Sequence, residues 1–171
     1  MKKIVALVLA MLMVLTAVSA MAGGSKGGKD IPYGNTDANV GLINADPTTA
    51  QKAVMDKVTA AGADGAVAAL AEEAPGLIPE GFNKISEMSC WKLDGDTSNL
   101  QELELIFKFA TPYEAGSEVT LLVGVSPADD VVEWIKLDGK ANADGDVVVK
   151  LTSAQLAKIS NNPFLVIPVT K

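Results

Sequence analysis

The 171-residue sequence predicts a mainly β fold, an antiparallel β-sandwich of about six to seven strands with an N-terminal helical segment. Three observations support this prediction. Apolar and polar residues alternate with a period of two through much of residues 81–171. Asp-Gly pairs separate these stretches, as expected for turns between short strands. Residues 46–80 instead carry an apolar stripe with helical spacing, bounded by Pro and Gly.

The helical segment, residues 46–80, is expected to contain two short helices. Asp46 can cap the first helix, and Pro47 fits its first helical position. The apolar stripe of this helix consists of Val54, Val58 and Ala61. A second, alanine-rich helix is expected over residues 66–73, ending at a Pro-Gly pair. Because valine and alanine bury little area each, we expect this segment to pack on the β domain that follows.

The β domain, residues 81–171, shows strand patterns at six places. These candidate strands are residues 85–92, 102–109, 118–125, 131–137, 147–151 and 164–169. The pairs Asp94-Gly95, Asp138-Gly139 and Asp144-Gly145 are expected to form turns at strand ends. Residues 153–160 are the one helix-like insert, with Ser153 as a potential cap.

The N-terminus carries an export signal. Two lysines precede an unbroken apolar run over residues 4–14, and Ala20-Met21-Ala22 matches a small-x-small cleavage site. These features are typical of a bacterial secretory signal peptide, residues 1–22. The Gly-rich residues 23–45 are expected to form a flexible linker, in which Val40–Ile43 could still anchor the chain. We therefore expect a secreted protein, extracellular or in the cell envelope, without a stable membrane span after signal removal.

The composition excludes several classes of function. The chain has 14 lysines, no arginine and no histidine, and its formal net charge is −7. Nucleic-acid binders need a basic surface, so DNA and RNA are poor candidate partners. Without histidine, Ser-His-Asp catalysis, Cys-His catalysis and histidine-bound zinc are excluded. The single cysteine, Cys90, is either a buried small hydrophobe or a thiol available for an intermolecular disulfide or other chemistry.

Residues 77–171 also carry short motifs that occur together in one group of domains. The motifs are Leu77-Ile78-Pro79-Glu80-Gly81-Phe82, Trp134, Asp144-Gly145-Asp146-Val147, and Ser160 with Pro163-Phe164-Leu165-Val166-Ile167. In these features the chain resembles uncharacterised immunoglobulin-like β-sandwich modules of secreted bacterial proteins, although Asn161-Asn162 separates Ser160 from Pro163. The resemblance implies an Ig-like sandwich, an extracellular setting, and a role as a spacer or contact surface without catalytic residues.

Three aromatic side chains are candidates for sugar binding: Trp91, Trp134 and Tyr113. Tryptophan suits sugars because its face is apolar while its N–H can donate a hydrogen bond. The alternative is that these rings fill the core, since β-sandwiches commonly bury a tryptophan.

Four oxygen-bearing side chains are candidates for a calcium site: Asp138, Asn142, Asp144 and Asp146. Calcium prefers oxygen ligands, but the spacing does not match an EF-hand loop. Residues 94–99 form a similar Asp- and Asn-rich stretch. The alternative is that these side chains bond to their own backbone in turns.

Paired carboxylates could hydrolyse glycosides without histidine. The candidate pairs are Glu72-Glu73, Glu102 with Glu104, and Asp129-Asp130, although a solvated surface explains each of them as well. The sequence as a whole favours an exported, non-catalytic module that contacts an unknown protein or an envelope or host polymer. A small carbohydrate-binding or calcium-steadied lectin-like domain is the alternative, and a carboxylate-based hydrolase ranks last. No cofactor is expected except calcium in the second case, and the oligomeric state stays open.

Overall fold

The structure, a computed structural model, describes residues 40–171. The expected signal peptide and most of the expected linker lie outside the described residues. The elements in chain order are β1 (Gly41–Asn44), α2 (Thr49–Ala60), α3 (Gly62–Glu73), β2 (Lys84–Ile85), β3 (Ser89–Asp94), β4 (Glu102–Phe107), β5 (Glu118–Val125), β6 (Glu133–Ala141), β7 (Val147–Thr152), α4 (Ser153–Ile159) and β8 (Phe164–Thr170).

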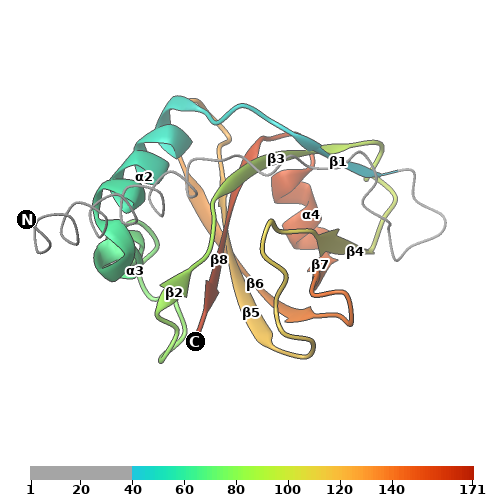
Figure 1. The fold of residues 1–171 in the computed structure, drawn as a ribbon. Coiled ribbons are helices and arrows are strands. Elements are labelled where there is room, and N and C mark those ends of the chain that lie inside the picture. The colour runs from blue at the N-terminus through green and yellow to red at the C-terminus, as the bar shows by residue number, and fades with distance from the viewer. Residues whose placement is uncertain (1–39) are drawn as a thin grey trace, which may run out of the picture.

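The strands form one antiparallel sheet, which confirms the prediction of a mainly β fold. The strand order is β1-β3-β8-β5-β6-β7-β4, and β2 pairs with the end of β8. The sheet curls strongly (Figure 1). Two differences from the sequence prediction follow. The described residues form eight strands instead of six or seven, and hydrogen bonds join them all into one sheet instead of two separate layers. The sheet is continuous because the central strand β5 pairs with β6 on one side and with β8 on the other.

The concave side of the curled sheet encloses an aromatic core, here called the inner cluster. Trp91 and Phe107 meet edge to face with ring centroids 6.5 Å apart, and Phe107 stacks on Phe109 at 6.2 Å. Alternating residues of β4, β5 and β7 and two residues of α4 complete this cluster. The alternation predicted for Leu103, Leu105 and Phe107 is therefore the inward face of β4.

The convex side carries a second core, here called the outer cluster. Helices α2 and α3 pack on the outward side chains of β3, β8 and β5, and they lie along one side of the sheet (Figure 1). Val58 and Leu70 from the helices and Leu122 and Leu165 from the sheet are completely buried here. These two helices form within the segment where the sequence predicts a helical layer on the β domain.

The first turn of α2 differs from the prediction at its cap. Thr48, not Asp46, is the N-cap, and with Gln51 it forms a reciprocal capping box. Gln51 also anchors the start of α2 to the sheet. Its side chain is completely buried, and its Nε2 donates to the carbonyls of Gly124 and Pro163 at 3.0 Å each. The same motif caps α4, where Thr152 replaces the expected Ser153.

Other boundaries also differ from the predictions. Helix α3 begins at Gly62, four residues earlier than expected, because the chain turns only around Ala61 and Gly62 (φ 69°). Residues 41–44 form strand β1, paired with β3, at the end of the stretch whose composition suggested a linker. Within residues 40–171, no helix combines the length and apolar character that crossing a membrane requires.

Asp138-Gly139 lies inside strand β6 and does not form the expected turn. Position 139 has no room for a side chain, because a Cβ on Gly139 would lie 2.7 Å from Cγ1 of Val147 and 2.9 Å from Cγ1 of Val149. The close approach of β7 therefore allows only glycine, and β6 continues to Ala141.

Candidate functional site

The outward face of the sheet is divided into two halves. Helices α2 and α3 cover the half formed by β3, β8 and β5, where the outward side chains are apolar. Helices α2 and α3 do not extend over the half formed by β6, β7 and β4 (Figure 1), and α4 contributes to the inner cluster, so we call the outward face of this half the bare half. Its outward residues include charged side chains on each strand, among them Glu104, Lys140 and Lys150.

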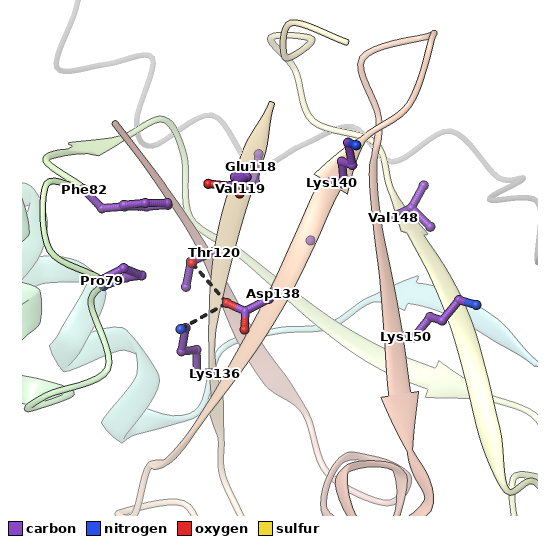
Figure 2. Close-up of a pocket in the computed structure, with 11 residues that line it drawn as sticks. Pro79, Phe82, Glu118, Val119, Thr120, Lys136, Asp138, Lys140, Val148 and Lys150 are labelled. Carbon is purple, nitrogen blue, oxygen red and sulfur yellow. Dashed lines mark hydrogen bonds and ion pairs between the residues drawn. The ribbon is translucent and has the colours of Figure 1, made fainter. Parts of the chain in front are cut away.

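A groove runs along the border between the two halves, and we call it the β6–β7 groove. Its volume is about 680 Å³, within the range of about 300–1,000 Å³ usual for ligand sites. Pro79 and Phe82, from the turn after α3, form one wall (Figure 2). The floor consists of outward residues of β5 and β6, and the far side is formed by β7 with Val148 and Lys150.

The groove is more basic than the rest of the chain. Its lining holds three lysines, Lys136, Lys140 and Lys150, against two carboxylates, Glu118 and Asp138. The lining therefore has a net positive charge, whereas the whole chain has a formal net charge of −7. The border of the groove adds a fourth lysine, because Nζ of Lys171 lies 5.6 Å from the centroid of the Phe82 ring and 3.5 Å from Glu118.

Asp138 stands at the centre of the groove floor. Its Oδ1 lies 3.1 Å from Nζ of Lys136 and accepts a long hydrogen bond from the Thr120 hydroxyl at 3.5 Å, as Figure 2 shows. The pairing between β6 and β7 ends at Gly139 and Val149, so Lys150 lies at the level of Asp138 on the strand across the groove. The side chains of β6 that line the floor are those of even-numbered residues, because alternate side chains point to opposite faces, and Gly139 lines it with its backbone.

Two of the three lysines of the groove, Lys140 and Lys150, are only loosely neutralised. Nζ of Lys150 is 3.9 Å from Glu104, and this exposed pair contributes little because solvent screens it. Among the described residues, no ion pair within 4.0 Å involves Lys140. The groove therefore presents ammonium groups that a ligand carboxylate or phosphate could approach.

A second hollow lies between the β3–β4 loop and α4. Its volume is about 520 Å³, and its lining is rich in hydroxyl and amide groups. Several of these groups already bond to each other, since the Thr97 hydroxyl donates to Ser160 Oγ at 2.6 Å and Ser160 donates to the Leu156 carbonyl. Asp96 accepts hydrogen bonds from Ser98, which lower the pKa of the Asp96 carboxyl. These bonds hold a turn together, in line with the alternative interpretation of residues 94–99.

The structure does not bring the three candidate sugar-binding aromatics together. Trp91 is only 2% exposed, faces the inner cluster, and donates from Nε1 to Ser89 Oγ at 2.8 Å. Trp134 packs against the outer cluster, on the opposite face of the sheet. Tyr113 packs against the inner cluster and bonds to the Ser86 hydroxyl, and burial raises the pKa of its phenol to about 12. These positions match core packing, and a buried Trp91 cannot stack on a sugar.

The structure separates Asp138 from the other three candidate calcium ligands, which lie in the turn after β6. Asn142 caps its own turn, because its Oδ1 accepts from the backbone N–H of Asp144 at 2.9 Å and of Asp146 at 3.0 Å. Asp138 lies four residues earlier on extended strand β6, about 13 Å away at 3.3 Å per residue. No cluster of three or more His, Cys, Asp and Glu side chains suited to a metal ion occurs in residues 40–171.

Three of the candidate carboxylates, Glu72, Glu73 and Asp129, have close structural partners. Glu72 and Glu73 both pair with Lys57, at 2.9 Å and 2.6 Å, which fastens α3 to α2. The carboxylate of Asp129 accepts from the Thr49 hydroxyl at 2.8 Å and from the Thr49 backbone N–H at 3.2 Å. These bonds lower the pKa of Asp129 and place its negative charge at the N-terminus of α2.

Cys90 is buried, as one of the two interpretations of the sequence expected. Its Sγ lies 3.9 Å from Oε1 of Gln51 beneath α2, and burial raises the pKa of the thiol to about 12. A thiol with this pKa is almost fully protonated at neutral pH and is a poor nucleophile.

The groove itself was not among the sites predicted from sequence. Its signal was present in part, since Lys136, Asp138 and Lys140 alternate along one strand pattern and Lys150 follows Val148 on another. That alternation predicts only a polar face, because it does not reveal which strands are neighbours. Phe82, from the turn after the helices, could not be assigned to this face without the fold.

Comparison of the chain with protein-family models, with characterised proteins and with solved structures finds no match, so the inferences about function depend on the chain's own residues.

Proposed function

We propose that this protein is an exported, non-catalytic module that works outside the cytoplasm by contacting a partner through the β6–β7 groove. The observation that carries the proposal is the unequal covering of one sheet face. Helices cover its apolar half, whereas the half next to them is bare and hollowed by a charged groove with an aromatic wall. Pockets of this size with a few convergent polar groups are the usual places for ligands.

The placement of the acidic pairs supports a non-catalytic role. Glycoside hydrolysis needs two carboxyl groups that flank the bond to be cleaved, one of them with a raised pKa. Glu72 and Glu73 instead share a lysine, and Asp129 serves a helix N-terminus. The export part of the proposal depends on the N-terminal sequence pattern, residues 1–22.

The resemblance to Ig-like modules is kept in this proposal for its motifs and the contact role that it implies, although hydrogen bonds join the described strands into one sheet. It is supported by the motif residues, of which Pro79 and Phe82 line the groove. A spacer or contact role is what such a resemblance implies. A lectin that depends on calcium has less support, because Asp138 lies on β6 away from the turn that holds the other three predicted ligands, and Asn142 Oδ1 in that turn already accepts from the backbone. An unchanged melting temperature at millimolar calcium would agree with this ranking.

Export and contact can be tested in one experiment. The full precursor is produced in the bacterium that encodes it, and the N-terminus of the product outside the cytoplasm is sequenced. We expect it to begin at Gly23, directly after Ala22. The mature protein is then labelled, mixed with intact cells, and the cell-bound fraction is measured.

Two matched valine substitutions locate the contact. Val148→Asp places a charge in the groove, whereas Val131→Asp places one on a valine that is 41% exposed in the loop before β6, outside the groove. We expect Val148→Asp to lose most of the cell-bound fraction and Val131→Asp to keep it, with both variants folded by circular dichroism. A wild-type protein that does not bind cells, or equal loss in both variants, would refute the proposal.

A further inference from the structure

We propose that the β6–β7 groove binds an acidic polysaccharide, a linear chain of sugar rings that carry carboxylates. This inference depends on the proposed function, because it names the partner that the same groove would contact.

The charge arrangement favours a ligand with several separated negative groups. Lys136 and Lys140 stand four residues apart on one extended strand, which separates their backbone positions by about 13 Å. Lys150 lies between these two levels on the neighbouring strand. A single small anion could approach only one of these ammonium groups closely, whereas a chain that repeats its carboxylates could approach all three.

The backbone beneath the groove leaves no room for an added peptide strand at the Lys140 end. One way in which extended peptides bind is by adding a strand to a free sheet edge. Gly139 and Lys140 of β6 are paired on both sides, by β5 and by β7, whereas residues 133–138 are paired with β5 alone. At the Lys140 end a ligand must therefore be recognised by side chains, and poly-L-glutamate in the test below shows whether a peptide binds along the rest.

The side chains that remain suit sugar rings. Phe82 and Pro79 supply a flat apolar wall, and sugar rings have apolar faces made of C–H groups that pack on aromatic rings. The floor supplies the Asp138 carboxylate as an acceptor and the Thr120 hydroxyl as donor and acceptor, which are the partners that sugar hydroxyls need. Lysine ammonium groups on both sides then select carboxylate-bearing sugars over neutral ones.

The test uses the mature protein and four purified polymers: alginate oligosaccharides, dextran, poly-L-glutamate and polyphosphate. Binding is measured by isothermal titration calorimetry at low salt and at 0.15 M salt. We expect alginate oligosaccharides to bind, and dextran, which has sugar rings without carboxylates, to bind at least about tenfold more weakly. Polyglutamate and polyphosphate are also expected to bind more weakly, because they offer charge without rings.

Charge-reversal variants assign the binding to the groove. Lys140→Glu with Lys150→Glu is compared with Lys108→Glu and Lys158→Glu, two exposed lysines outside the groove, so both double variants have the same net charge. We expect the groove pair to weaken alginate binding by at least about tenfold and the control pair to change it less than about twofold. Phe82→Leu, which keeps an apolar side chain but removes the ring, is expected to weaken alginate binding without increasing the salt dependence.

Four outcomes would overturn the inference: no alginate binding, equal binding of dextran, equal binding of polyglutamate or polyphosphate, or equal effects of the two double variants. If alginate fails while Val148→Asp still abolishes cell binding and Val131→Asp does not, the proposed contact function stands and only the polysaccharide is wrong. If neither cells nor polymers bind, both proposals fail.

Discussion

The boundary between the covered and bare halves of the outer sheet face crosses strands β5 and β6, which carry different side chains on its two sides. Along β6, Trp134 lies against the outer cluster, whereas Lys140 lines the groove. Along β5, Leu122 is completely buried under the helices, whereas Glu118 is exposed at the groove. One strand thus passes from a core to a solvated surface within a few residues. The helical layer therefore ends where the outward side chains of the sheet stop being apolar, and the groove begins at the same place.

The largest expected effect comes from removing packing on the covered half. Leu122→Ala deletes a completely buried side chain between β5 and the helices, and we expect it to lower the free energy of unfolding by about 2–5 kcal/mol. Val148→Ala on the bare half removes a half-buried side chain and is expected to cost about 1 kcal/mol or less. Urea unfolding measures both. Equal losses would show that the two halves are packed alike.

The next effect concerns a buried polar side chain that fastens α2 to the sheet. Gln51→Ala removes the amide that donates to the Gly124 and Pro163 carbonyls, and the capping bond to Thr48 N–H at 3.0 Å. We expect a loss of about 2–3 kcal/mol, because buried acceptors then lack a partner.

The second capping box provides the matched control for Gln51. Gln155 occupies the same N3 position in α4 and accepts from Thr152 N–H at 2.9 Å, but among the described contacts its side chain bonds only to this cap residue. We expect Gln155→Ala to cost only about 1 kcal/mol, as for the loss of a cap. If both variants lose the same stability, the contacts from Gln51 to the sheet contribute nothing beyond capping.

A smaller effect is expected at the border of the groove itself. Gly139→Ala places a methyl group against Val147 and Val149, so β6 and β7 must shift apart. We expect a loss of about 1–3 kcal/mol, as for overpacking of a core. Thermal unfolding provides the measurement, and an unchanged melting temperature would show that the two strands can separate freely.

Gly139 also shows how far the sequence could predict the fold. The alternation of Leu103, Leu105 and Phe107 identified β4 because inward and outward residues are fixed by local geometry. The Asp138-Gly139 pair was misinterpreted as a turn because the reason for that glycine is a neighbouring strand, which a local pattern does not contain. The curl of the sheet and the strand order depend on such long-range pairings, so the single sheet could not be predicted.

The candidate site was predictable to an even smaller extent. The sequence suggested Trp91 and Asp138 for chemistry by residue type, but type alone does not distinguish a core ring from a binding ring. Asp138 does lie in the groove, although with a lysine and a threonine instead of calcium ligands. Phe82 and Lys150 come from segments nearly seventy residues apart, and only the folded chain places them around one hollow.

The smallest expected effect concerns a buried acid away from both halves. Glu87 is 7% exposed, accepts from the Ala110 backbone N–H at 3.0 Å, and burial raises the pKa of its carboxyl above the ordinary value. The folded protein therefore holds this proton more tightly than the unfolded chain does. The resulting stability is fully present below the unfolded pKa of about 4.3 and is lost as the pH rises through the folded pKa.

Glu87→Gln removes this titration while keeping an oxygen that can accept from Ala110 N–H. We expect the variant to be more stable than the wild type at pH 7, by under about 1 kcal/mol, and the difference to shrink towards pH 4. Glu72, Asp96 and Asp129, whose pKa values are lowered by their hydrogen bonds, act in the opposite direction but are present in both proteins, so they cancel in the difference. Urea unfolding of both proteins from pH 4 to pH 8 gives this difference directly. A constant difference across that range would mean that Glu87 has the same pKa in the folded protein as in the unfolded chain. In that case water would reach the Glu87 carboxyl, and its burial in the loop before β3 would not raise its pKa.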